Sequence, residues 1–184
     1  YASRATKVFL SSCKFMIHDI MENSLNVLKN GFSAKGKFEY SKLHGNAFLL
    51  ANLIELSEKE IVPYELIMKI TVFATAFIKN NTTSTSADLY FKGLICWILM
   101  SGLMNYKDDY YLKMQTSQLF LFWKVLLTHS FTYRNEEELK RNLEVRTHAL
   151  TCLLTYLNNT QIDKETAKQI SYLLTKCSNF NHSV

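Results

Sequence analysis

The sequence predicts an all-α protein built from stacked antiparallel helix pairs. Its 184 residues include one Pro and five Gly, which is very few for a fold that needs the many turns of a sheet. No run of Val, Ile and Thr alternates with polar residues at the period of two that is typical of a half-buried strand. Over most of the chain, apolar residues recur every three or four positions, which is the period of one helix face.

About seven helices are expected, and the first spans residues 3–29. Its apolar face is formed by residues at spacings of four, three and four: Phe9, Cys13, Met16 and Ile20. Gly31 is a natural stop, because glycine accepts the left-handed conformation that often follows a helix. A linker of residues 31–42 leads to the second helix, of about residues 41–56. The third begins at Pro63, since proline suits a first helical turn.

The fourth and fifth helices contain two dense apolar blocks, at residues 93–104 and 119–127. The longer block has about 12 residues, whereas a membrane-spanning helix needs roughly 20, so both are interpreted as core helices. The fifth helix opens at Asp108, next to a second aspartate, and such carboxylates suit the positive end of a helix dipole. Both helices are apolar around more than half of their circumference, which predicts neighbours on two sides.

The sixth helix starts with three glutamates at 136–138, and the seventh begins near Asp163. The second, fourth and sixth helices begin about 44 and then about 50 residues apart, close to the spacing of HEAT and armadillo helix pairs. The predicted pairs are 41–80, 84–128 and 135–177, preceded by the helix of 3–29. We expect one solenoid segment over residues 1–184, cut from a longer chain because Tyr1 is not an initiator Met. A closed helical bundle is the alternative.

No pattern in the sequence indicates catalysis, a cofactor or a metal site. The five histidines stand at no metal-binding spacing, and the four cysteines form no C-x-x-C pair. Phosphate-binding glycine loops and the G-x-S-x-G nucleophile motif are also missing. The cluster Glu136, Glu137 and Glu138 is better explained by the helix dipole than by acid–base chemistry. We therefore predict a non-enzymatic protein.

The excess positive charge of the chain lies mostly near its N-terminus. Residues 1–42 contain seven Lys or Arg and three Asp or Glu, whereas the rest contains 14 and 13. Because aromatic residues are interleaved with lysines in 29–42, a basic helical domain that binds nucleic acid or anionic membrane through this region is the alternative function. Without an RNA-recognition motif, nucleic acid is not the expected partner. The candidate partner-binding residues are Lys35, Lys37, Lys42, Tyr106, Tyr110, Tyr111 and Tyr133.

Four segments together resemble a known family. They are HGNAFLLANLI at 44–54, CWILMSGLM at 96–104, LFLFWKVLL at 119–127 and LEVRTHALTCL at 143–153. Their order and spacing are similar to those of the large HEAT-repeat proteins that accompany the clathrin adaptor of the trans-Golgi network. The family includes HEAT-repeat-containing protein 5 of animals and the large adaptor-accessory protein of yeast.

The resemblance implies a long cytoplasmic scaffold that acts in vesicle transport between the trans-Golgi network and endosomes. It also implies protein partners, namely accessory proteins of the clathrin adaptor, and an indirect, peripheral association with Golgi and endosomal membranes. No binding residue is carried over from the family. Trp97 and Trp123 are interpreted as core anchors, and Arg146, which lies on an apolar stripe, is expected to have a buried partner from the next helix.

Overall fold

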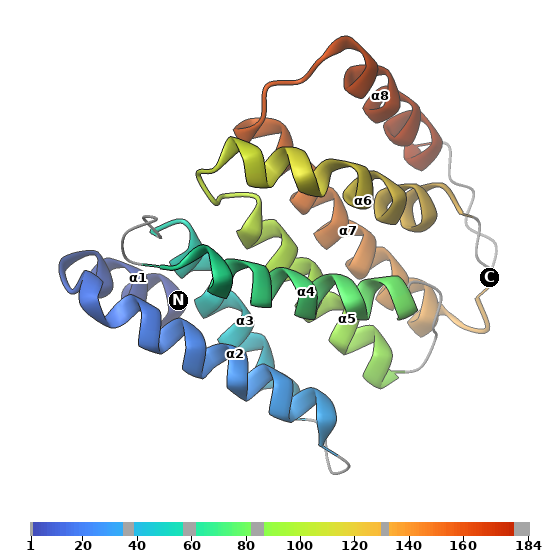
Figure 1. Ribbon diagram of the computed structural model, residues 1–184. Coiled ribbons are helices and arrows are strands. Elements are labelled where there is room, and N and C mark those ends of the chain that lie inside the picture. The colour runs from blue at the N-terminus through green and yellow to red at the C-terminus, as the bar shows by residue number, and fades with distance from the viewer. Residues whose placement is uncertain (1, 35–38, 57–61, 82–86, 130–132, 179–184) are drawn as a thin grey trace.

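The computed structural model describes residues 2–34, 39–56, 62–81, 87–129 and 133–178, and within these ranges all regular structure is helical (Figure 1). The elements are α1 (Ala2–Ser12), the 3-10 helix η1 (Lys14–Met16), α2 (Ile17–Ser33), α3 (Tyr40–Ile54), α4 (Tyr64–Asn81), α5 (Ala87–Leu103), α6 (Asp109–Thr128), α7 (Glu136–Asn159) and α8 (Lys164–Ser178). None of these helices is long and apolar enough to cross a bilayer. The all-α prediction is confirmed.

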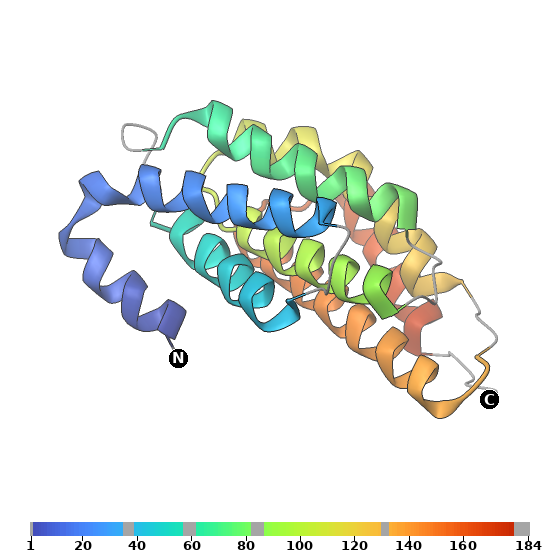
Figure 2. The same ribbon diagram turned by 90° about the horizontal axis from the view of Figure 1, so that it is seen from below.

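The helices form two layers that run side by side along the stack (Figures 1 and 2). Helices α3, α5 and α7 make one layer, in which α5 packs against both neighbours and α1 lies beside α3. Helices α2, α4, α6 and α8 make the other layer. The helices succeed one another in rows and do not close around one centre. This is the solenoid-like arrangement that the sequence predicts.

The predicted helix of 3–29 is wrong in detail, because the chain forms two helices there. The backbone leaves the helical conformation at Cys13, with φ −124° and ψ 54°, so that α1 lies beside α3 while α2 joins the other layer. Phe9, predicted to lie on the apolar face, is 61% exposed. Gly31 does not end a helix. A Cβ at this position would lie 2.4 Å from a methyl carbon of Leu43, so glycine permits close packing of α2 on α3.

The helices that pack most closely as antiparallel pairs differ from those paired in the sequence. Extensive contacts join α2 to α3 and α4 to α5, whereas the predicted pair 41–80 joins α3 to α4. The predicted pair 84–128 likewise joins α5 to α6, although α5 packs on α3, α4 and α7. Spacing gives the period of the stack but does not tell whether a helix pairs with the one before or after it.

The core is centred on α5, which is buried over most of its length from Leu94 to Leu103. Gly102 faces the backbone of α3, and a Cβ there would stand 2.4 Å from the Cα of Ala51. Trp97 and Trp123 are buried, as expected of core anchors, and the Trp123 indole N–H donates to the Ala149 carbonyl at 3.0 Å. Gly102 therefore lets the backbones of α3 and α5 approach closely, and Trp123 joins α6 to α7.

Candidate binding surface

The second layer is more open than the first, and the part of it that the structure describes contains two apolar grooves. The α2–α4 groove encloses about 650 Å³ between helices that touch along little of their length. It is lined by Lys29, Phe32, Glu65, Met68, Lys69, Val72, Phe73, Ala76 and Phe77. Phe32 stands between the helices, with its ring centroid 4.9 Å from that of Phe73 and 5.3 Å from that of Phe77. These three aromatic rings pack together and line the groove between the two helices.

The α6–α8 groove encloses about 520 Å³. Its lining residues come from two helices: Ser117, Phe120, Leu121, Lys124, Lys168, Gln169, Tyr172 and Leu173. The Phe120 ring packs edge-on against the buried Trp123 ring, with 5.5 Å between the two ring centroids. Leu121 and Tyr172 are 60% and 50% exposed. Such exposed apolar side chains around a hollow are typical of a surface that binds another molecule.

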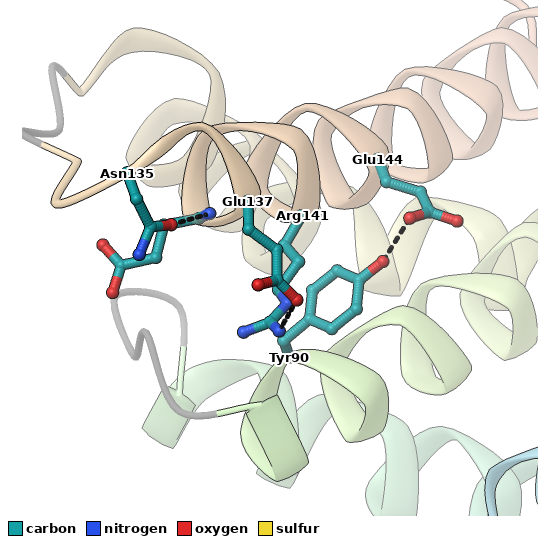
Figure 3. A network of polar contacts seen from close by, with 6 residues as sticks. Tyr90, Asn135, Glu137, Arg141 and Glu144 are labelled. Atoms are coloured by element: carbon teal, nitrogen blue, oxygen red, sulfur yellow. Dashed lines mark hydrogen bonds and ion pairs between the residues drawn. The ribbon is translucent and has the colours of Figure 1, made fainter. Parts of the chain in front are cut away.

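The first layer carries polar contacts between α5 and α7, and Figure 3 shows one of them, between Tyr90 and Glu144. The Tyr90 hydroxyl donates to the Glu144 carboxylate, and burial together with this bond raises the pKa of Tyr90. Further along, the Ser101 and Thr155 hydroxyls lie 3.3 Å apart, and the Asn159 amide donates to the Asn105 side chain at 3.1 Å. All three contacts join residues 54 positions apart, so α5 and α7 lie parallel and in register.

The start of α7 is stabilised by its own side chains, also drawn in Figure 3. Asn135 is the N-cap, and its side-chain oxygen accepts from the Glu138 N–H at 2.9 Å. Glu137 and Arg141 form an ion pair one turn apart. The three glutamates therefore lie in the first turn of α7, where the helix dipole favours them.

Two histidines lie near Glu144 in this layer. Burial lowers the pKa of both His44 and His148 from its ordinary value, and the Glu144 carboxylate opposes that shift. His44 packs between aromatic rings, with centroids 4.9 Å from Tyr40 and 4.8 Å from Phe48. Among the described residues, no group of three or more His, Cys, Asp or Glu side chains is placed to hold a metal ion. The arrangement is a packed aromatic and ionisable cluster.

The sequence-predicted binding residues are not brought together. Tyr106, Tyr111 and Tyr133 are core residues, at most 6% exposed, so their prediction as interface residues is wrong. A tyrosine near a helix end can place its hydroxyl in an interface or bond it to a polar group inside the protein, and the sequence does not tell these cases apart. The Tyr111 oxygen lies 2.8 Å from that of Thr71, and Tyr133 donates to the Asn142 side chain at 2.8 Å.

The other predicted binding residues lie apart from one another. Tyr110 is exposed at the start of α6. Lys42, on α3, is exposed and forms an ion pair with Glu39 at 3.5 Å. Lys35 and Lys37 lie outside the residues that the structure describes. Tyr110 and Lys42 are therefore the two predicted residues whose exposure suits contact with a partner, and both stay predictions.

Arg146 is expected to have a buried partner from the next helix, whereas the contact that the structure shows is with a backbone carbonyl at the end of the preceding helix, α6. The guanidinium is buried in α7, and its Nη2 donates to the backbone carbonyl of His129 at 2.8 Å. His129 follows the last residue of α6, so the contact ties the end of α6 to α7. The role of Arg146 is structural.

Comparison with known proteins identifies a relative of this chain. The chain is 66% identical over 178 residues to the AP-1 accessory protein LAA1 of Saccharomyces cerevisiae. The predicted resemblance to the large adaptor-accessory proteins is confirmed. The aligned region covers 97% of this chain and 9% of LAA1, so the chain corresponds to a small segment of that protein. No family model matches the chain, and no solved structure matches it.

The segments that resemble the adaptor-accessory proteins lie mostly in the core, although the segment 119–127 also contains the groove residues Phe120, Leu121 and Lys124. The Trp97 and Trp123 segments lie in α5 and α6, and the His44–Gly45 segment lies in α3. The groove residues Leu121 and Tyr172 were missed, because each stands beside a buried stripe of its helix. One signal in the sequence could have indicated them: the helices that carry them contain lysines but almost no acidic residues.

Proposed function

We propose that this chain is a non-enzymatic scaffold segment that binds protein partners of a clathrin adaptor. The observation that carries the proposal is the 66% identity to the AP-1 accessory protein LAA1 over nearly the whole chain. An accessory protein acts through contacts with other proteins, and a two-layered helical stack offers long surfaces for such contacts. The two apolar grooves in the second layer supply places where a partner could dock.

The proposed setting is vesicle transport between the trans-Golgi network and endosomes. In this setting the chain is cytoplasmic and reaches the membrane indirectly, through the adaptor and its accessory proteins. The similarity to LAA1, whose name places it with the AP-1 adaptor, supports this setting. We assign the chain neither a cofactor nor a nucleic-acid partner.

Capture of partners from cytosol tests the proposal. The tagged chain is incubated with cytosol at physiological salt, and the bound proteins are identified by mass spectrometry. We expect adaptor subunits or adaptor-accessory proteins to be enriched over a tag-only control. If none of these proteins is enriched, the segment is a spacer whose parent protein binds its partners elsewhere.

The salt dependence of binding separates this function from the alternative. Binding of nucleic acid or anionic lipid through residues 29–42 depends on phosphate neutralisation and falls steeply with added salt. Binding in an apolar groove falls far less. Lys42, in the basic region, is already paired with Glu39, and this favours the protein-binding function.

A further inference from the structure

The two grooves of the second layer differ in charge. The α2–α4 groove carries both signs, and the Lys69 ammonium lies 2.9 Å from the Glu65 carboxylate. The α6–α8 groove is lined by Lys124 and Lys168 and by no acidic residue. In the α2–α4 groove, part of the lysine charge is therefore neutralised by Glu65, whereas the charged residues that line the α6–α8 groove are all positive.

The charge asymmetry extends along both helices of the second groove. Residues 110–128 and 166–178 contain no Asp or Glu and four lysines, namely Lys113, Lys124, Lys168 and Lys176. Among the described residues, no carboxylate lies within ion-pair distance of Lys124 or Lys168. An occupant that carries carboxylates would supply the missing negative charge and would be steered to the groove.

The floor and rim of this groove are apolar. Leu173 is buried at the bottom, and Phe120 is half-buried against the core. Leu121 on one side and Tyr172 on the other are largely exposed, and the Lys176 ammonium lies 5.9 Å from the centre of the Tyr172 ring. An occupant must therefore also bring apolar side chains, which would cover these residues and remove them from water.

We propose that the α6–α8 groove binds a peptide segment of a partner protein in which aliphatic or aromatic residues are interspersed with Asp and Glu. The inference rests on the proposed scaffold function and specifies the chemistry of the partner. A bilayer surface is too flat to reach Leu173 between the two helices. Nucleic acid would satisfy the lysines but brings no aliphatic side chains for Leu121 and Leu173.

Selection from random peptides tests the proposal even when the natural partner is unidentified. Random peptides displayed on phage are selected on the purified chain at physiological salt. We expect the selected peptides to be enriched in Asp and Glu together with Leu, Ile, Phe or Trp. Failure to enrich such peptides would overturn the proposal, as would enrichment of basic or uncharged ones.

Matched variants then locate the site by fluorescence anisotropy of a selected, labelled peptide. The double change K124E and K168E should weaken binding by about tenfold or more, because attraction becomes repulsion. The double change K29E and K79E alters the net charge equally on α2 and α4 and should change affinity by less than about twofold. Leu121→Ser should also weaken binding. If the two double variants weakened binding equally, the attraction would be non-specific, and the assignment of the α6–α8 groove as the peptide-binding site would be wrong.

Two further measurements decide between occupants. Vesicles of phosphatidylcholine with phosphatidylserine should not sediment the chain at physiological salt, and sedimentation velocity should show no self-association that Leu121→Ser abolishes. A positive result in either would replace the peptide with a membrane or with a second copy of the chain. Circular dichroism confirms that each variant is folded.

Cross-linking locates the peptide directly, without relying on a variant that binds less tightly. A photoreactive benzoylphenylalanine at position 121 should cross-link the peptide, whereas one at position 72 should not.

The peptide selection can fail while adaptor proteins are still captured from cytosol. In that case the partner docks elsewhere and only the groove assignment is lost. Conversely, acidic peptides could bind the groove although no adaptor protein is captured, and then the setting in adaptor transport is lost. The two proposals are thus tested separately.

Discussion

The two layers of this helical stack are built from similar helices but serve different ends. In the layer of α3, α5 and α7, Gly102 lets two backbones meet, and polar contacts tie α5 to α7 along its length. In the layer of α2, α4, α6 and α8, apolar grooves lined partly by aromatic side chains lie between α2 and α4 and between α6 and α8. The comparison teaches that close backbone approach and hydrogen bonds join helices of the first layer, whereas the second layer leaves apolar side chains along grooves where a partner could bind.

The largest effect is expected from loss of an indole in the core. Trp123→Ala removes a fully buried ring and the hydrogen bond from its indole to the Ala149 carbonyl, so it should lower the free energy of unfolding by about 3–5 kcal/mol. Trp97→Ala should act similarly. Urea unfolding followed by circular dichroism measures both. Unchanged midpoints in both variants would contradict the assignment of the core.

A smaller loss is expected where α3 meets α5. Gly102→Ala places a methyl group 2.4 Å from the Cα of Ala51, and the resulting overpacking should cost about 1–3 kcal/mol. Gly93→Ala, in the same helix, is the matched control, because its Cβ would meet nothing within 4 Å. That change should stabilise the chain by about 0.5–1 kcal/mol through helix propensity. Thermal unfolding of both variants tests the contrast, which fails if they shift the midpoint equally.

Acid should weaken the first layer through its histidines. Burial lowers the pKa of His44 and His148 in the folded chain below 6.5, so the unfolded chain binds more protons near that pH. The stability that the two neutral, buried imidazoles contribute is fully present above pH 6.5, and it is lost as pH falls through their pKa values in the folded chain. The free energy of unfolding should therefore decrease as the pH is lowered from 7.5 to 5.5. The double variant H44Q and H148Q should show a flatter dependence, and an equally steep one would assign the effect to other groups.

The smallest effect is expected at the groove rims. Val72→Ser and Leu121→Ser change side chains that are 59% and 60% exposed, so each should alter the unfolding free energy by less than about 0.5 kcal/mol. Differential scanning calorimetry of the two variants measures this. A loss comparable to that of Gly102→Ala would mean that the grooves contribute to the core and would remove the distinction between the layers.

Features that depend on nearby residues are predicted well by the sequence. Asp108 caps α6 by accepting from the Tyr110 and Tyr111 N–H groups, and the glutamates at 136–138 open α7, because these contacts reach only a few residues. The two tryptophans are buried because their helices are apolar on most sides. Each of these features is set within one helix.

Features that depend on distant partners are not predicted. The break at Cys13 follows from the separate positions of α1 and α2, which no local pattern encodes. Tyr106 and Tyr111 resemble interface residues until the structure shows a 5.6 Å contact between their ring centroids inside the core. The α6–α8 groove escapes prediction for the same reason, because Leu121 and Tyr172 become neighbours only when α8 folds back onto α6.

The register of 54 residues between α5 and α7 has a mechanical consequence. Three polar contacts lie at different points along these helices, from Tyr90 to Asn159. A shift of either helix along its axis would break all three contacts together. We therefore expect α5 and α7 to move as a single unit when the stack flexes.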